Sequence, residues 1–111
     1  KMSDCIFCKI IAGDIPCNKV YEDDHVLAFH DIAPKADTHI LVIPKKHIVN
    51  LSATQENEWP IVTKVLQSIN TIAAQQQLEG FRVISNNGEK GGQEVFHMHW
   101  HVLAGSKLIG F

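Results

Sequence analysis

The fold of this chain is decided by the stretch His97-Met98-His99-Trp100-His101. Successive side chains of an extended strand point to opposite faces, so the three imidazoles would share one face of a strand. Met98, Trp100 and Val102 would share the other face. The pattern predicts a strand over residues 95–104 that packs one face against a core and turns its histidines toward a chemical site.

Four more strands are predicted by short runs rich in β-branched and aromatic residues, at residues 19–22, 25–31, 39–43 and 81–85. Asp23-Asp24 fits a hairpin turn between the first two strands. Pro44 would close the third strand, because proline has no N–H for the ladder of a central strand. A short helix is predicted over residues 5–12, and Gly13-Asp14-Ile15-Pro16 would stop it.

One long amphipathic helix is predicted between the third and fourth strands. Its apolar residues recur at i, i+3, i+4 and i+7 and are Val62, Val65, Leu66, Ile69, Ile72 and Ala73. Ser52 with Gln55 is a capping-box pattern, and Pro60 belongs in a first turn, so regular helix should begin near residues 57–59 and end at Gly80. Together the elements predict an α+β fold: a five-stranded antiparallel sheet with one long and one short helix.

Length and charge limit what the chain can be. The 111 residues suffice for one core, so residues 1–111 are assigned to a single domain. A formal net charge of -2 with mixed signs leaves no dense basic stretch for a nucleic-acid polymer. No apolar run approaches the roughly 20 residues that span a bilayer. No secretory segment is evident either, so we expect a cytoplasmic protein without a membrane partner.

A row of imidazoles suits nucleophilic attack on phosphorus, because imidazole is largely unprotonated near pH 7 and its phosphorus–nitrogen adduct is easily hydrolysed. Such a nucleophile needs an acceptor for its second nitrogen, a proton donor for the leaving group, and N–H groups aimed at the phosphoryl oxygens. The Gly-rich loop at residues 86–93, next to the histidines, could bring backbone amides close to an anion.

The chain resembles the histidine-triad family, defined by His-φ-His-φ-His-φ-φ with φ apolar, here His97-Met98-His99-Trp100-His101-Val102-Leu103. The resemblance extends through Ile6-Phe7, Ile15-Pro16, residues 31–34, residues 38–48 and residues 91–96. It is closest to bacterial members of the nucleotide-binding branch, the purine nucleoside phosphoramidases. The dinucleoside polyphosphate hydrolases of the same family are the alternative.

The resemblance implies a role for each of several polar residues. His99 would be the nucleophile and form a nucleotidyl intermediate, His101 would contact the phosphate and help the amine leave, and His39 would complete a polar relay behind the nucleophile. Asp31 would accept both ribose hydroxyls. The residues implied to sandwich the purine are Ile6, Phe7, Ile10, Phe29 and Ile32, and those implied to surround the phosphate are Asn86, Gly92, Gln93, Glu94 and Val95. Glu94 replaces the serine of many relatives, so its backbone N–H would carry that role.

Cys5, Cys8, His47 and His97 form a second constellation. Cys-x₂-Cys with two distant histidines fits a closed tetrahedral zinc site, and some bacterial relatives with this pattern carry a structural zinc. The alternative is a reduced Cys-x₂-Cys pair on a helix face without a ligand. Cys17 is interpreted as an ordinary thiol.

The sequence is therefore interpreted as a homodimeric enzyme that hydrolyses adenosine or guanosine 5′-phosphoramidates to the mononucleotide and an amine, with a structural zinc and no metal in catalysis. The homodimer is implied by the resemblance alone. Two other classes stay open. A metallohydrolase would use His97, His99 and His101 as zinc ligands, although three ligands from one strand splay poorly around a metal. A non-catalytic nucleotide-binding module would bind without turnover.

Overall fold

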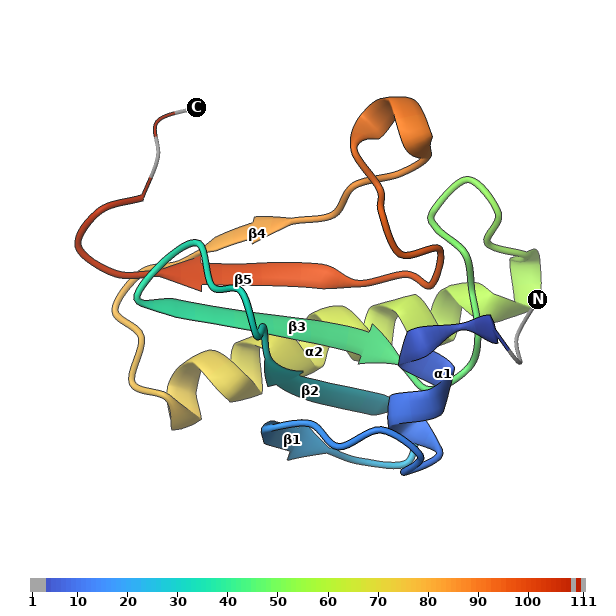
Figure 1. Cartoon of the computed structure of the whole chain (residues 1–111), viewed down its shortest axis with the longest axis horizontal. Coiled ribbons are helices and arrows are strands. Elements are labelled where there is room, and N and C mark those ends of the chain that lie inside the picture. Colours follow the sequence, from blue (N-terminus) through green and yellow to red (C-terminus); the bar gives the residue numbers. More distant parts are fainter. Residues whose placement is uncertain (1–3, 109, 111) are drawn as a thin grey trace.

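The computed structural model describes residues 4–108 and 110. Its elements are α1 (Ile6–Ile11), β1 (Lys19–Glu22), β2 (Val26–His30), β3 (Thr38–Pro44), the 3₁₀ turn η2 (Glu56–Glu58), α2 (Trp59–Gln75), β4 (Arg82–Ile84), the 3₁₀ turn η3 (Glu89–Gly91) and β5 (Trp100–Ala104). The strands form one antiparallel sheet in the order β1-β2-β3-β5-β4 (Figure 1). The predicted α+β class, with one long and one short helix, is confirmed.

Helix α2 covers one face of the sheet and lies behind it in Figure 1. Its apolar stripe, at helical spacing, packs against side chains that point backward from the three central strands. This layer buries Val26, Ala28, Ile40, Val42, Val65, Ile69, Ile72 and Val102. The long helix therefore takes the face opposite to the cavity-lining histidines.

The short helix α1 packs on the other face, near one end of β2 and β3 (Figure 1). Phe7 is its buried side chain and lies among Leu27, Phe29, Leu41 and Ile43. Because α1 has only 6 residues, it covers only part of this face. The rest is open to a cavity. No helix in the described part of the chain is long and apolar enough to cross a membrane.

The ends of α2 differ from the prediction. Regular helix begins at Trp59 as expected, but the Glu58 side chain accepts the Gln55 N–H, so the capping box is Gln55 with Glu58 and the one predicted at Ser52 is wrong. The helix ends at Gln75 rather than Gly80, because Gln77 adopts a left-handed conformation with φ 57°.

Strand β5 begins at Trp100, so the predicted strand over residues 95–104 is too long at its start. The N–H of Met98 bonds the carbonyl of Ile48, in the segment after β3, instead of extending the ladder with β3. The alternation of faces holds all the same. Met98 packs with Ile48 and Val62 on the α2 side, while His97 and His99 contact Phe7 on the α1 side.

Candidate active site

A cavity of about 570 Å³ opens on the α1 side of the sheet. Thirteen of the fourteen residues predicted for catalysis or substrate binding line it, and Gln93 is the exception. The thirteen are Ile6, Phe7, Ile10, Phe29, Asp31, Ile32, His39, Asn86, Gly92, Glu94, Val95, His99 and His101.

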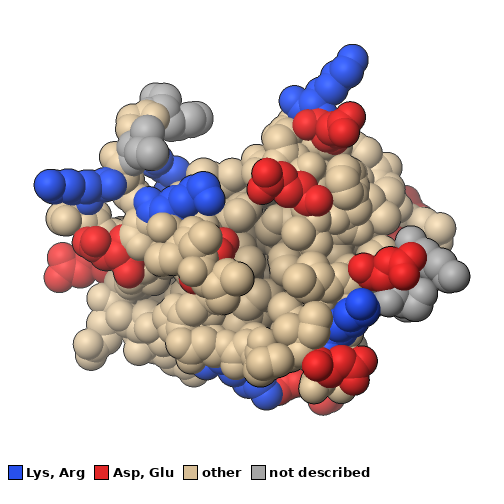
Figure 2. Space-filling view, in the orientation of Figure 1, with Lys and Arg blue, Asp and Glu red and all other residues tan. Residues whose placement is uncertain are grey.

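 Charged side chains lie mainly around the rim of this face, and its hollowed middle is largely uncharged (Figure 2).

His99 is held with one nitrogen toward the protein and the other toward the cavity. Its Nδ1 lies 2.7 Å from the backbone carbonyl oxygen of His97. A carbonyl only accepts, so Nδ1 carries the proton and, in the neutral imidazole, Nε2 keeps its lone pair. The ring is 7% exposed and stands edge-on to Phe7, with ring centroids 5.1 Å apart. Nε2 is the nitrogen left for a ligand.

His101 and His39 form a hydrogen-bonded pair. A backbone N–H outside the pair determines which ring nitrogen of each histidine carries the proton. The backbone N–H of Lys35 donates to Nδ1 of His39 over 3.0 Å, so His39 carries its proton on Nε2. That Nε2–H donates to Nδ1 of His101 over 2.9 Å. His101 therefore carries its own proton on Nε2, beside the cavity. His39 was predicted to complete a polar relay behind the nucleophile. Its hydrogen bond goes to His101, whereas the His97 carbonyl orients His99.

Burial keeps the histidine pair neutral. It lowers the pKa of His101 to about 4, with the nearby His99 and His39 adding to the shift. Burial also lowers the pKa of His39, against the attraction of Asp31. Both rings are thus uncharged in the ligand-free site at pH 7, and a bound anion would favour a proton on them.

Asp31 lies where β2 ends, at the mouth of the cavity. Its Oδ1 accepts the N–H of Ala33 over 2.8 Å, and its Oδ2 is 3.4 Å from Nε2 of His39. An ionised carboxylate has about four lone-pair sites and the Ala33 N–H uses one of them, so acceptor sites remain for hydroxyl groups of a ligand. The position is compatible with the predicted contact to ribose.

The loop between β4 and β5 brings backbone donors to the cavity. Gly92 has φ 90°, a conformation that favours glycine, and turns the chain toward Glu94 and Val95. Within the described part of the chain, the N–H groups of Glu94 and Val95 have no hydrogen-bond partner. Both residues line the cavity with His99, so these two N–H groups are free for an anion.

Gln93 is buried and points away from the cavity. Its side-chain amide donates to the carbonyls of Val49 and Val95, and its backbone N–H donates to Gly88. No donor of Gln93 is left for a phosphate. Gln93 was predicted among the residues around the phosphate; it lies outside the lining of the cavity, and its side chain supports the loop.

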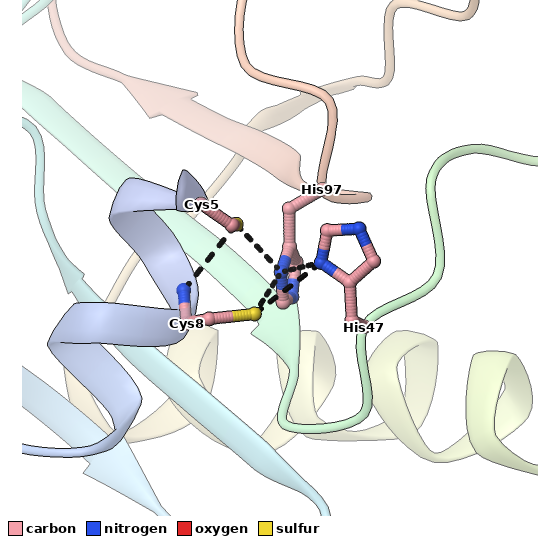
Figure 3. Close-up of side chains that lie close together, drawn as sticks. All are labelled: Cys5, Cys8, His47 and His97. Atoms are coloured by element: carbon pink, nitrogen blue, oxygen red, sulfur yellow. Dashed lines mark hydrogen bonds between the residues drawn. The ribbon is translucent and has the colours of Figure 1, made fainter. Parts of the chain in front are cut away.

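Cys5, Cys8, His47 and His97 converge beside α1 (Figure 3). The Nδ1 atoms of the two histidines are 3.2 Å apart, and Nδ1 of His97 is 3.4 Å from Sγ of Cys5 and 3.6 Å from Sγ of Cys8. A tetrahedral zinc with usual bond lengths sets its ligands about 3.3 Å (N to N) and about 3.6 Å (N to S) apart. The four side chains fit a zinc ion.

The protonation states of the cluster also suit a metal. Nε2 of His97 lies 2.8 Å from the carbonyl oxygen of Pro44 and so carries the proton, which leaves Nδ1 bare among the other ligands. Burial lowers the pKa of His47 and lowers that of His97 to about 4, so both rings are neutral at pH 7. Burial and the neighbouring Cys5 raise the pKa of Cys8 to about 11, so its thiol must lose a proton when metal binds.

A family model described as the HIT domain matches residues 12–108. The chain belongs to the HIT family. A HIT-like protein of Synechococcus elongatus is 48% identical over 106 residues, which cover 95% of this chain and 93% of that protein. Protein hit of Bacillus subtilis is 50% identical over 101 residues, covering 90% of this chain and 70% of that protein.

Solved structures of HIT proteins share the whole fold. A histidine triad protein from Clostridium difficile superposes with a TM-score of 0.92 at 54% identity, covering 97% of this chain and 96% of its own. A HIT family hydrolase from Clostridium thermocellum superposes with a TM-score of 0.93 at 37% identity, covering 100% of this chain and 98% of its own. The HIT fold of this chain is thus shared with bacterial proteins, among them a hydrolase.

The geometry of this HIT protein argues against a metal held by the histidine triad. His97 belongs to the cysteine cluster, and Nδ1 of His99 is bonded to a carbonyl, so the interpretation of His97, His99 and His101 as three zinc ligands is wrong. Asp31, His39 and His101 form a second group whose potential metal-ligand atoms lie within 4.8 Å of one another. Its two nitrogens are 2.9 Å apart with a proton between them, which is a hydrogen bond rather than two metal ligands.

Several residues of the site were not anticipated from the sequence. Lys35 lines the cavity and fixes the tautomer of His39 through its backbone N–H, and Pro44 fixes that of His97 through its carbonyl. Leu41 and Leu103 line the cavity from the neighbouring strands β3 and β5. The period-2 pattern could have assigned Leu41 and Leu103 to this face. The contacts of Lys35 and Pro44 could not have been found in this way, because they are made by backbone groups, which every residue type carries.

Proposed function

We propose that this HIT protein is a hydrolase that cleaves the phosphorus–nitrogen bond of adenosine and guanosine 5′-phosphoramidates, releasing the nucleoside monophosphate and an amine. One observation carries the proposal. His99 offers a bare Nε2 to the cavity because its Nδ1–H is tied to a backbone carbonyl, and the ring of His101 lies beside it with centroids 5.1 Å apart. A nucleophile and a proton donor thus stand next to each other.

In the first step the lone pair on Nε2 of His99 attacks phosphorus, and the bond from phosphorus to the amine nitrogen breaks. The phosphoryl anion favours uptake of one proton by the His39–His101 pair, and the nearby Asp31 favours it too. His101 gives its Nε2 proton to the leaving nitrogen, so a neutral amine departs. The N–H groups of Glu94 and Val95 stabilise the charge on the phosphoryl oxygens.

In the second step a water molecule attacks phosphorus and the bond to Nε2 of His99 breaks. His101 left the first step with a bare Nε2 and takes the proton of the attacking water. The products are the nucleoside monophosphate and a restored His99. The His39–His101 pair again holds the extra proton until the anionic product leaves.

The apolar part of the cavity suits a purine ring. Phe7 and Phe29 meet edge to face with centroids 5.7 Å apart, and Ile6 and Ile10 line the same wall. Ile32, on the loop after β2, is 101% exposed and could close over a bound base. Asp31 beside this wall would accept the ribose hydroxyls.

The zinc proposed for Cys5, Cys8, His47 and His97 has a structural role. Bound there, it would hold α1 against the segment after β3 and the segment before β5. No proton of the proposed reaction passes through these ligands. We also propose that the chain forms a homodimer through the outer edge of β4.

Mass spectrometry of an acid-quenched reaction tests the proposed function. The parent protein, mixed with an adenosine phosphoramidate, should release AMP and carry one adenylyl group in the quenched sample. His99→Asn should lose at least about a thousandfold in turnover and carry no adenylyl group, because loss of a nucleophile costs several orders of magnitude.

The matched control is His25→Asn at an exposed histidine of the β1–β2 hairpin, which should behave like the parent. His99→Asn with more than about a tenth of parental turnover would contradict covalent catalysis. Binding of AMP without release from any phosphoramidate would instead support a non-catalytic module.

A further inference from the structure

We infer that the side chain of Gln93 is a positioning residue that sets the direction of the two phosphate-binding N–H groups. The inference rests on the proposed function, because it assigns the free N–H groups of Glu94 and Val95 to the phosphoryl oxygens. Gln93 itself touches no substrate. It would act by fixing the loop on both sides of those two donors.

The side chain of Gln93 uses all of its hydrogen-bonding capacity. Oε1 accepts the Nδ2–H of Asn50 over 3.0 Å and the N–H of Gly88 over 2.8 Å. Nε2 donates to the carbonyls of Val49 over 2.7 Å and Val95 over 3.1 Å. A glutamine amide has two donors and two acceptor sites, so none is left over. The residue is 4% exposed, and a fully satisfied buried network of this kind is rigid.

The segment to which Gln93 is tied is itself fixed. Ile48 is buried with Met98, whose N–H donates to the Ile48 carbonyl. Asn50 cannot turn away from Gln93, because its Oδ1 accepts the N–H of Ala53 over 3.0 Å. Leu51 adds a second tie, since its N–H donates to Oδ1 of Asn87 at the other end of the loop.

The contacts of Gln93 enclose the two free donors. Its backbone N–H is bonded to the Gly88 carbonyl, just before Glu94, and its side chain holds the Val95 carbonyl, just after the Val95 N–H. The two peptide groups between these points carry the N–H groups of Glu94 and Val95, two residues that line the cavity. Both ends of this short segment are thus anchored by Gln93, which limits how far the two peptide groups can turn. The amide of Gln93 thus determines where an anion is bound.

The test compares the affinity for AMP with the affinity for adenosine, measured by calorimetry on the full chain. Gln93→Met keeps the length of the side chain and removes all four bonds. We expect it to weaken AMP binding about tenfold, to leave adenosine binding within about twofold, and to lower kcat more than it raises KM, because oriented donors act mainly on the transition state. The matched control is Gln67→Met, at an exposed position of α2.

A second variant covers the case in which Gln93→Met does not fold. Asn50→Asp keeps the acceptor for Ala53 but replaces the donor to Gln93 with a carboxylate oxygen, so it should lower the AMP-to-adenosine affinity ratio in the same direction. An unchanged ratio in the folded variants would overturn the role of Gln93. A parent protein that binds AMP no more tightly than adenosine would overturn the phosphate site of the proposed function, which is a separate outcome.

Discussion

His97, His99 and His101 have the same side chain but different roles. The difference arises because one ring nitrogen of each histidine is hydrogen-bonded to a different group. The Pro44 carbonyl leaves Nδ1 of His97 bare for a metal, and the His97 carbonyl leaves Nε2 of His99 bare for the cavity. His39 leaves a proton on Nε2 of His101. The alternation of the sequence predicted the shared face of the three rings. It could not predict the tautomers, because backbone groups from distant segments set two of them.

The neutral state of His101 makes stability depend on pH. The pKa of His101 is about 4 in the folded protein and 6.5 at its ordinary value, so the unfolded chain holds more protons between these two pH values. The free energy of unfolding should therefore fall as pH drops from about 6.5 to about 4. His101→Asn should show a shallower fall in urea unfolding measured at several pH values.

The groups around His101 are His39, His99, Asp31 and Lys35, and none of them is changed in that variant. His25→Asn, at the exposed hairpin histidine, is the control and should keep the parental pH dependence. An equally steep fall in His101→Asn and the parent would assign the pH dependence to other groups.

At the scale of elements, the predicted positions were right and several ends were not. Periodicity placed all five strands and both helices, because side-chain burial repeats along each element. The start of β5 could not be read from alternation, since residues 97–99 keep alternating faces while Met98 pairs with Ile48 outside the sheet. The end of α2 depended on Gln77, a residue type that gives no stop signal.

Gln77 provides a prediction for the C-terminus of α2. The N–H of Leu78 bonds the Ala73 carbonyl and the N–H of Gln77 bonds the Ala74 carbonyl, which is a Schellman motif with glutamine where glycine is preferred. A left-handed conformation costs a non-glycine residue about 1–2 kcal/mol. Gln77→Gly should raise the free energy of unfolding by about 0.5–1 kcal/mol, after the greater freedom of glycine in the unfolded chain is subtracted.

The neighbouring glutamine is the matched control for that change. Gln76 has φ -85° in the right-handed region, so glycine relieves nothing there and Gln76→Gly should be destabilising. Thermal unfolding of the two variants should shift in opposite directions. Shifts in the same direction would show that backbone conformation at Gln77 does not limit stability.

At the scale of the whole molecule, the Cys5–Cys8–His47–His97 cluster joins three segments that are distant in sequence. Helix α1 and its N-cap residue supply Cys8 and Cys5, the segment after β3 supplies His47, and the segment before β5 supplies His97 (Figure 3). The Cys-x₂-Cys spacing pointed to a site, and the resemblance supplied the two histidines. Which histidine nitrogens face the cysteines required the structure, because it depends on chain contacts across 92 residues.

Zinc should be present at about one ion per chain in protein purified without chelator, by elemental analysis. Cys5→Ser should lose the metal and unfold at a clearly lower temperature, because a metal that binds only the folded state stabilises it. Cys17→Ser is the matched control, since Cys17 lies outside the cluster and should leave zinc content and unfolding temperature unchanged. A metal-free parent protein as stable as the zinc-loaded one would contradict the structural role.

Assembly is the largest scale at which the structure makes a prediction. Strand β4 is the outermost strand of the sheet on its side, and the exposed fractions of Phe81 and Val83 there are 40% and 38%. An outermost strand with exposed apolar side chains invites pairing with another strand, and two copies related by a twofold axis would present the same strand to each other. Light scattering after size exclusion should therefore give twice the chain mass of 12.4 kDa.

Val83→Lys should shift the protein toward monomer because two lysines would meet near the axis. Ile32→Lys, at a fully exposed residue far from that edge in the sequence, is the control and should stay dimeric. A parent protein that runs at the mass of one chain, or a Val83→Lys variant that stays dimeric at low salt, would show that β4 is not the interface.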